Sequence, residues 1–270
     1  MKKHFIMLLV VAMLLAFAAC GATSGKPAAD TAPDYAADAA ADTAPEPAKT
    51  DAPAADPAPA PSAEPAKEVD YEITYKSNVM WVSSIGTTWE QTIVEITNTG
   101  TAPLYLGSAS YDLEDGEGNL LSTESLVSFY PTVVDAGDKA YMYNETTFDG
   151  DPVEDVNVVP HIKAEKAKIE NTRYPVSDIK ISEDRFYGVK VMGRIENNTS
   201  EDLSMPEVAV VLLNADGEAI GVVFTYVMDG VPVGEKVGFE ASGFSLPDSV
   251  TADAVADYVA FAYPSMQLQF

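Results

Sequence analysis

Apolar and polar residues alternate along most of the chain after residue 67, which is the pattern of strands with one buried face. Residues 108–114 keep their apolar side chains at one parity, and Val208, Val210 and Leu212 share one parity further on. Period two over six to eight residues, with one polar face, predicts half-buried antiparallel strands. The clearest alternation falls in residues 189–196, where the two sets are Val189, Val191 and Ile195 against Lys190, Arg194 and Glu196.

Turn signals separate these strands. Residues 115–118 (DGEG) and 215–217 (ADG) stand where a strand must reverse, and an Asp-Gly pair supplies the positive φ that a tight hairpin needs. Asn98-Thr99-Gly100 breaks an earlier strand in the same way. No long amphipathic helix is evident; residues 161–170 are expected to form the connector between modules, or one or two helical turns.

The strand–turn–strand stretch occurs twice. A constant shift of 99 residues, without a gap, aligns residues 95–121 with residues 194–220. A later turn, residues 135–138, matches residues 232–235 at a shift of 97, so one loop of the second copy is two residues shorter. The equivalent pairs at the shift of 99 are Asn98 and Asn197, Leu104 and Leu203, Leu113 and Leu212, and Gly118 and Gly217.

Many short strands and about 100 residues per repeat predict an all-β protein of two tandem immunoglobulin-like antiparallel β-sandwiches. The expected first domain covers residues 68–163, and the second covers residues 164–270. We expect the two domains to fold with the same strand order.

Both modules resemble the FxLYD domain, a bacterial extracellular sandwich often found behind lipoprotein signals. The namesake motif corresponds to residues 111–115 (YDLED) and 210–214 (VVLLN), which both keep its Leu. The resemblance covers roughly residues 85–160 and 185–263. It implies an immunoglobulin-like fold and a surface location, and it implies no known chemistry.

The first nineteen residues have the features of a secretory signal peptide. Lys2 and Lys3 precede an apolar run, and small residues then precede Cys20. The segment resembles a bacterial lipoprotein signal, with Phe17 in place of the usual Leu three residues before the Cys. Cys20 is the only cysteine, so no intrachain disulfide can form. We therefore expect lipid attachment at Cys20 and anchoring on the extracytoplasmic face of the cell membrane; an ordinary signal peptide is the alternative.

Residues 20–67 are expected to form a disordered tether. The stretch is rich in Ala, Pro and Asp, and its one aromatic residue is Tyr35. Such a composition cannot bury enough apolar surface to offset chain entropy. At roughly 3 Å per residue for extended polyproline II, the tether would reach on the order of 100 Å.

The formal net charge of −26 excludes some classes of partner. The tether contributes little of this charge, so the folded region is itself acidic. Its field repels polyanions, and we expect neither nucleic acid nor an anionic lipid surface as a direct partner.

Histidine and cysteine limit the enzyme hypotheses. After signal removal the one histidine is His161, expected to be a solvent-facing connector residue without a Ser or carboxylate partner. No Ser/His/Asp or Cys/His set is evident within a repeat, and a His-based zinc site lacks ligands. We therefore expect no catalytic residues, no cofactor and no metal site.

Two features leave a binding function open. Asp112, Glu114, Asp115 and Glu117 crowd one hairpin, which is expected to be a hydrophilic turn, with a weak calcium site as the alternative. Trp81 and Trp89 lack counterparts in the second copy; packing is the expected role, and a ligand platform is the alternative.

The leading hypothesis is a lipid-anchored, non-enzymatic surface protein whose modules serve envelope interaction or assembly with an unidentified partner. The alternative is ligand capture, in which a cation, glycan or peptide is held for a membrane machine. An exposed aromatic groove around Trp81 and Trp89 would favour this alternative.

Overall fold

The structure is a computed structural model of the chain, and it describes residues 67–185, 188–243 and 246–265. The predicted signal peptide, Cys20 and all of the predicted tether except Lys67 lie outside the described residues. Within the described ranges no helix has the length and apolar character needed to cross a membrane. These residues form an all-β protein of antiparallel sheets, as the alternation predicted, with one short 3-10 helix.

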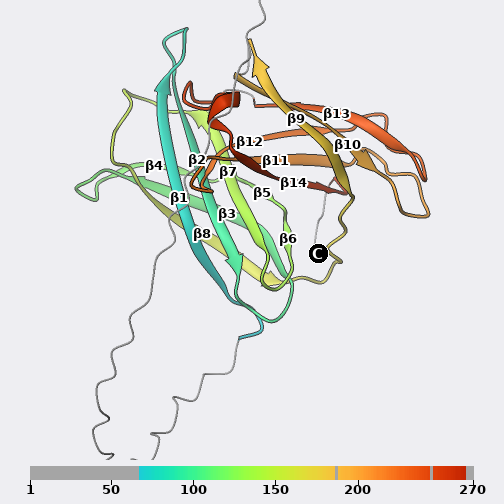
Figure 1. The fold of residues 1–270 in the computed structure, drawn as a ribbon. Coiled ribbons are helices and arrows are strands. Elements are labelled where there is room, and N and C mark those ends of the chain that lie inside the picture. Colours follow the sequence, from blue (N-terminus) through green and yellow to red (C-terminus); the bar gives the residue numbers. More distant parts are fainter. Residues whose placement is uncertain (1–66, 186–187, 244–245, 266–270) are drawn as a thin grey trace, which may run out of the picture. The chain divides into compact units, whose positions relative to one another are not determined.

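The first half of the described chain, β1 to β8, forms two antiparallel sheets (Figure 1). One has the strand order β1-β2-β7-β5, and in the other β3 pairs with β4 and β6 and, along its opposite edge, with β8. The strands are β1 (Tyr71–Val82), β2 (Thr88–Asn98), β3 (Leu104–Glu114), β4 (Leu120–Glu124), β5 (Ser128–Tyr130), β6 (Val133–Val134), β7 (Lys139–Thr147) and β8 (Asn157–Lys166).

The second half, β9 to β14, follows the order β14-β11-β12-β13-β10-β9. Strands β12 and β13 join at a single residue pair, Phe224 and Ser242, so the path divides there into two groups of three strands. The elements are β9 (Val176–Asp184), β10 (Gly188–Glu196), β11 (Glu207–Leu213), β12 (Ala219–Tyr226), β13 (Lys236–Ser242), the 3-10 helix η1 (Ala252–Ala254) and β14 (Asp257–Tyr263).

The repeat in the sequence is also a repeat in strand pairing. Leu113 pairs with Ser122 across the β3–β4 hairpin, and Leu212 pairs with Gly221 across the β11–β12 hairpin. The two turns close alike: the Gly118 N–H donates to the Asp115 carbonyl at 2.9 Å, as the N–H of Gly217 does to Asn214 at 3.0 Å. Both glycines have positive φ, +82° and +79°, which explains the glycine at this position.

A buried asparagine organises each half at the end of its second strand. Asn98 Nδ2 donates to the carbonyls of Ala102 and Val134, both at 2.9 Å. Asn197 Nδ2 donates to the carbonyls of Glu201 and Val231, both at 2.8 Å. In each half the asparagine carbonyl also accepts the N–H of a turn glycine, and its Oδ1 accepts an N–H two residues on. The same side chain therefore ties the same three segments together twice.

Two local expectations differ from the structure. Residues 161–166, expected in a connector or short helix, belong to β8, which pairs with β3 as far as Lys166. The expected domain boundary at 163/164 thus falls inside a strand. The outer face of the β3–β8 pair is polar. The sequence of β8 is therefore as polar as that of a linker, although the strand is paired along its length.

Each half has its own apolar interior between its sheets. In the first half the core includes Val94, Ile96, Leu104, Leu113 and Met142, among others. In the second half it is built largely from valine; the fully buried members are Val189, Val191, Ile195, Val208, Val210, Leu212 and Val223.

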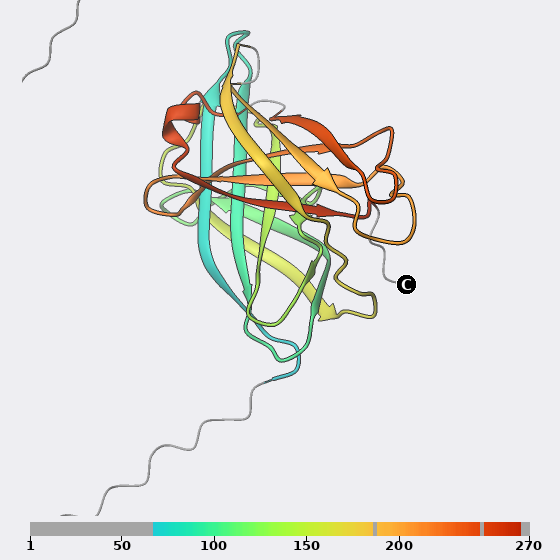
Figure 2. The same ribbon diagram turned by 45° about the vertical axis from the view of Figure 1, so that its right-hand side comes forward.

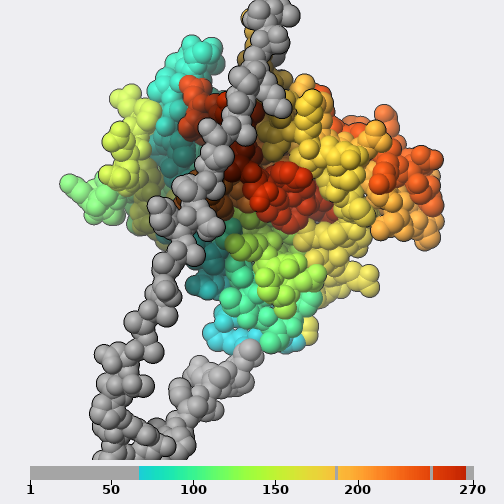
Figure 3. Space-filling view, in the orientation of Figure 1, coloured from blue at the N-terminus to red at the C-terminus, as the bar shows by residue number. Residues whose placement is uncertain are grey.

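A third apolar cluster joins the halves; we call it the seam. It lies between the outer face of the β1-β2-β7-β5 sheet and the outer face of β11, β12 and β14, and the strands of the two faces cross in both ribbon views (Figures 1 and 2). Figure 3 shows the green surface of the first half meeting the red surface of the second. The buried seam residues are Ile93, Tyr130, Tyr141 and Tyr143 from the first half and Ala209, Val211, Leu213, Ala219, Val222 and Tyr263 from the second.

Candidate functional site

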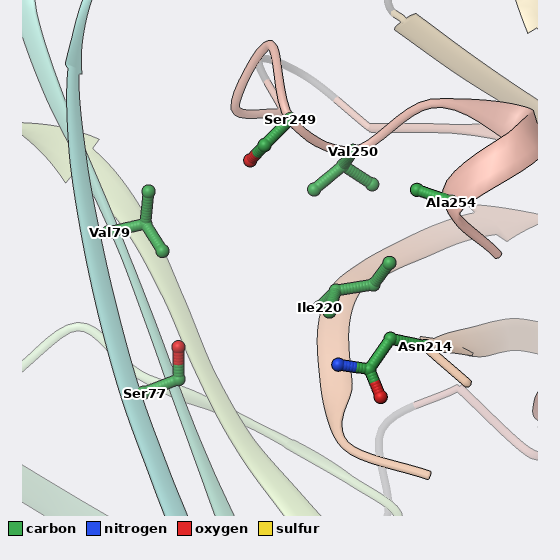
Figure 4. Close-up of a pocket in the computed structure, with 7 residues that line it drawn as sticks. All are labelled: Ser77, Val79, Asn214, Ile220, Ser249, Val250 and Ala254. Atoms are coloured by element: carbon green, nitrogen blue, oxygen red, sulfur yellow. The ribbon is translucent and has the colours of Figure 1, made fainter. Parts of the chain in front are cut away.

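A cleft opens at one end of the seam (Figure 4). Its volume is about 260 Å³. Ser77 and Val79 of β1 form one wall, and residues of the second half face them across the opening. The facing residues are Asn214 of the β11–β12 turn, Ile220 of β12, Ser249 and Val250 of the loop before η1, and Ala254 of η1.

Trp81 and Trp89 lie on the same face of the β1–β2 hairpin as this cleft. They are direct cross-strand partners, and both are half-buried. Alternate residues of a strand share a face. Trp81 therefore shares a face of β1 with Val79, which lines the cleft, and Trp89 shares a face of β2 with Ile93, which packs in the seam. Gln91 lies between Trp89 and Ile93 on β2, and its side chain donates to the Ile220 carbonyl at 3.0 Å. The tryptophans thus lie beside the cleft on the same face of the hairpin, outside its lining residues.

The cleft suits a small, largely apolar group with a few polar atoms. Valine and isoleucine side chains line it from both halves, and the polar groups are two serines and an asparagine. Ligand pockets for drug-sized molecules are typically about 300–1,000 Å³. The cleft lies below that range, so it matches a peptide side chain or a small fragment better than a whole cofactor.

A second candidate is a buried polar network inside the first half. The Tyr111 hydroxyl donates to Glu90 Oε1 at 2.5 Å and accepts from Asn144 Nδ2 at 2.8 Å. Asn78 Nδ2 donates to Glu90 Oε2 and to Thr92 Oγ1, both at 2.7 Å. Glu90 is 1% exposed and Tyr111 is fully buried. This network occupies interior positions that an apolar core would normally fill.

Burial sets the protonation of this network. It raises the pKa of Glu90, although hydrogen bonds from Tyr111 and Asn78 oppose the shift and the charge of Glu124 adds to it. Burial and the neighbouring Glu90 raise the pKa of Tyr111, so this hydroxyl stays protonated. Among the described residues, Asn78 Oδ1 and Ser122 Oγ are buried without a hydrogen-bond partner. The network can hold a proton, but the described side chains do not satisfy it fully.

His161 differs from the sequence expectation. Its Nε2 lies 2.9 Å from Asp112 Oδ2, whereas no carboxylate partner was expected. The cause is the register of β8 on β3, which places His161 opposite Ser110 and next to Asp112 on the outer face of the sheet. Thr123 of β4 donates to the other oxygen of Asp112 at 2.6 Å. The carboxylate therefore stands between the imidazole and the hydroxyl on an exposed surface.

The acidic hairpin uses its carboxylates within the protein. Asp115 Oδ1 accepts the N–H groups of Glu117 and Asn119, both at 2.9 Å. The hydrogen bond from the Asn119 side chain, and then these backbone bonds, lower the pKa of Asp115. Glu114 accepts from Asn157, and the Thr123 and His161 bonds lower the pKa of Asp112. Within the described ranges no three His, Cys, Asp or Glu side chains are grouped as metal ligands would be.

The seam also contains a titratable group. Glu207 opens β11 and pairs with Tyr226 on one side and Tyr263 on the other. Burial raises the pKa of Glu207 to about 7, with a hydrogen bond to Tyr226 opposing the shift. Arg173 lies nearby, 5.1 Å from the Phe261 ring centroid, and donates to the Val133 carbonyl at 3.2 Å. This end of the seam changes charge near neutral pH.

The seam was not predicted from the sequence, although one signal was available. Residues 208–213 (VAVVLL) are apolar at both parities, which is typical of a strand buried on both faces. In the structure Ala209, Val211 and Leu213 face the first half while their neighbours face the core. At the shift of 97, Tyr141 and Tyr143 correspond to Gly238 and Glu240, and both tyrosines face the seam.

Comparison with known proteins adds no assignment: no protein-family model matches the chain, and no curated protein matches it.

Proposed function

We propose that this protein is a lipid-anchored, non-enzymatic protein of the extracytoplasmic membrane face. Its two halves are tandem immunoglobulin-like sandwiches that serve envelope interaction or assembly. The observation that carries the proposal is the seam: two copies of one scaffold are joined through apolar outer faces and present a shared cleft and exposed strand edges. Cys20 supplies the anchor, and residues 20–67 supply a disordered tether that holds the sandwiches away from the membrane.

The geometry around His161 supports a non-catalytic role. In a hydrolase triad the imidazole stands between the nucleophile and the carboxylate, so that it can take the proton of the hydroxyl. Here Asp112 stands between Thr123 and His161, so the hydroxyl proton points to the carboxylate. The His161 side chain is 51% exposed on the sheet surface. The arrangement suits a surface polar contact better than a nucleophile and base.

The first test concerns the anchor. Replacing Cys20 with Ser should release the protein from the membrane fraction or stop its processing, because lipid chains contribute roughly 0.8 kcal/mol per buried methylene to retention. Unchanged membrane retention of Cys20→Ser would contradict the anchoring.

The second test concerns the partner. Photo-crosslinking groups at exposed positions of both halves, in intact cells, should capture one reproducible envelope protein. Crosslinks that stay diffuse at every position would contradict a binding role.

Ligand capture remains a second candidate because of the cleft beside Trp81 and Trp89. Replacing Val79 with Asp would place a charge in the cleft wall. If ligand capture is the function, this variant should lose a bound small molecule or peptide that native mass spectrometry detects on the wild type. Ser84→Asp, at an exposed position of the same hairpin, serves as the control.

A further inference from the structure

One strand edge of the second half is open. Strand β13 pairs with β10 along its whole length, from Lys236 to Ser242, but on its other side it meets β12 only at Phe224. Within the described part of the chain, the backbone of Gly238, Phe239 and Glu240 has no strand partner on that side. A cleft of about 220 Å³ separates the two strands there. It is lined by Thr225, Tyr226, Val227, Met228, Asp229 and residues 237–240.

The first half fills the equivalent edge with its own chain. At the shift of 97, residues 238–240 correspond to residues 141–143 of β7, and these pair with β5. In the second half the chain between the hairpin and β13 is two residues shorter. Its residues up to Tyr226 belong to β12 and stay paired with β11. No segment is left to cross to β13. The open edge is therefore a strand site that the same scaffold occupies elsewhere.

Exposed apolar side chains surround the open edge. Tyr226 is 41% exposed, Met228 is 73% exposed and Val233 is 48% exposed. In the first half, Phe129 and Tyr130 of β5 are 8% and 2% exposed, because the strand buries one side chain on each face. An added strand with apolar side chains at alternate positions would cover one face of this edge.

The chain carries one segment with this pattern outside the described residues. Residues 266–270 read MQLQF, with apolar residues at alternate positions. The segment follows β14, which ends at Tyr263 opposite Glu207, the partner of Tyr226 in the cleft wall. Strands β11 and β12 lie between β14 and the open edge, which is therefore about three strand spacings, or roughly 14 Å, from Tyr263. From Tyr263 the extended chain reaches at most about 11 Å by residue 266, so the segment of the same molecule is too short to lie along β13 over its whole length. A second molecule can supply the segment antiparallel to β13, as β5 is to β7.

We propose that residues 266–270 of a second copy of this chain add to β13 as an antiparallel strand, pairing with residues 238–240. The inference rests on the proposed role in assembly and names the partner as another copy. Main-chain hydrogen bonds supply the affinity, and the apolar residues of the segment cover the rim. A short added strand must offset the entropy of association, so we expect weak, concentration-dependent self-association.

The test compares two soluble chains by sedimentation velocity from micromolar to millimolar concentration. Both begin at residue 20 and carry Cys20→Ser; one ends at residue 270 and the other at residue 265. The longer chain should associate as concentration rises, and the shorter one should remain a monomer. A peptide of residues 264–270, added to the shorter chain, should shift the amide resonances of Gly238, Phe239 and Glu240.

Matched lysine variants locate the surface. Met228→Lys and Val233→Lys place charges on the exposed rim, so they should fold normally and weaken self-association about tenfold or more. Leu126→Lys, at an 88% exposed position of the first half, should leave it unchanged.

Equal behaviour of the two chain lengths, or amide shifts confined to other strands, would overturn the inference. If the longer chain stays monomeric while the anchored protein still crosslinks to an envelope protein in cells, the proposed function stands and self-addition alone fails. Loss of every crosslink together with monomeric behaviour of the longer chain would contradict both.

Discussion

The two halves share their strand pairs and asparagine contacts, yet one end of their interiors has opposite chemistry. The first half places a hydrogen-bonded polar network there, and the second half places apolar side chains at the same positions. The equivalent pairs are Glu90 and Val189, Thr92 and Val191, Tyr111 and Val210, Glu124 and Val223, and Asn144 and Ala241.

This difference shows that the scaffold does not depend on a particular core chemistry. Turn glycines and the buried asparagines recur in both halves, whereas the interior at this end does not. A buried carboxylate costs stability unless it is fully hydrogen-bonded, and the valines of the second half show that an apolar solution fits. The polar interior of the first half is therefore a local feature added to a common frame.

The outer faces differ as well. Asp112 of β3 is partly exposed and contacts His161 and Thr123, whereas its equivalent Val211 of β11 is fully buried in the seam. The same scaffold position is thus a polar surface in one half and an interface in the other.

The strongest way to break this comparison is to exchange the two outer-face residues. Val211→Asp would bury an unpaired carboxylate in the seam and should lower the free energy of unfolding by about 4 kcal/mol or more. Asp112→Val alters a solvated surface and should have a far smaller effect. Urea denaturation of both variants checks the difference; similar losses would contradict the assignment of the seam.

The equivalence of the asparagines predicts equal losses in the two halves. Asn98 and Asn197 are 1% and 0% exposed, and replacing either with Ala leaves buried carbonyls without a donor. Each variant should lose about 2–3 kcal/mol of unfolding free energy. Exposed Asn157→Ala serves as the control. A large loss in one half only would show that the two contacts are not equivalent.

Glu207 sharpens the comparison because its equivalent in the first half, Ser108, has no titratable side chain. The pKa of Glu207 rises from 4.5 to about 7 in the folded protein, so the folded state binds the proton more tightly than the unfolded state. The free energy of unfolding should therefore fall as pH rises from about 4.5 to 7. Burial of Glu90 and Glu124 acts with the same sign.

Glu207→Gln should remove the part of this decrease that belongs to the seam, on the order of 2 kcal/mol after allowance for residual solvent contact. Thermal melts across this pH range measure it. Exposed Glu72→Gln should leave the slope unchanged, and an unaltered slope in Glu207→Gln would contradict the role of Glu207.

Much of the fold was predictable because it depends on local patterns. Alternation predicted the antiparallel strands, and the position of Gly118 and Gly217 after their turns matched a backbone that needs positive φ. The role of residues 161–166 was not predictable in the same way. A strand with a polar outer face and a solvated connector have similar compositions, and only the register on β3 separates them.

The candidate sites were less predictable because they depend on contacts between distant segments. The cleft joins β1 to the loop before η1, and the His161–Asp112 contact spans 49 residues of sequence. Glu90 and Tyr111 meet across two sheets, so neither residue alone signals a buried network. The missed seam had a local signal, the run of apolar residues 208–213, that shows burial on both faces without naming the partner surface.

The seam should make the two halves one folding unit, because its apolar faces are buried only while both halves are folded. Both tryptophans of the chain, Trp81 and Trp89, lie in the first half, so their fluorescence follows that half while far-UV circular dichroism follows both. In a urea titration of the soluble Cys20→Ser chain, the two signals should give one coincident transition. Separate midpoints, with fluorescence and circular dichroism changing in different steps, would contradict the claim.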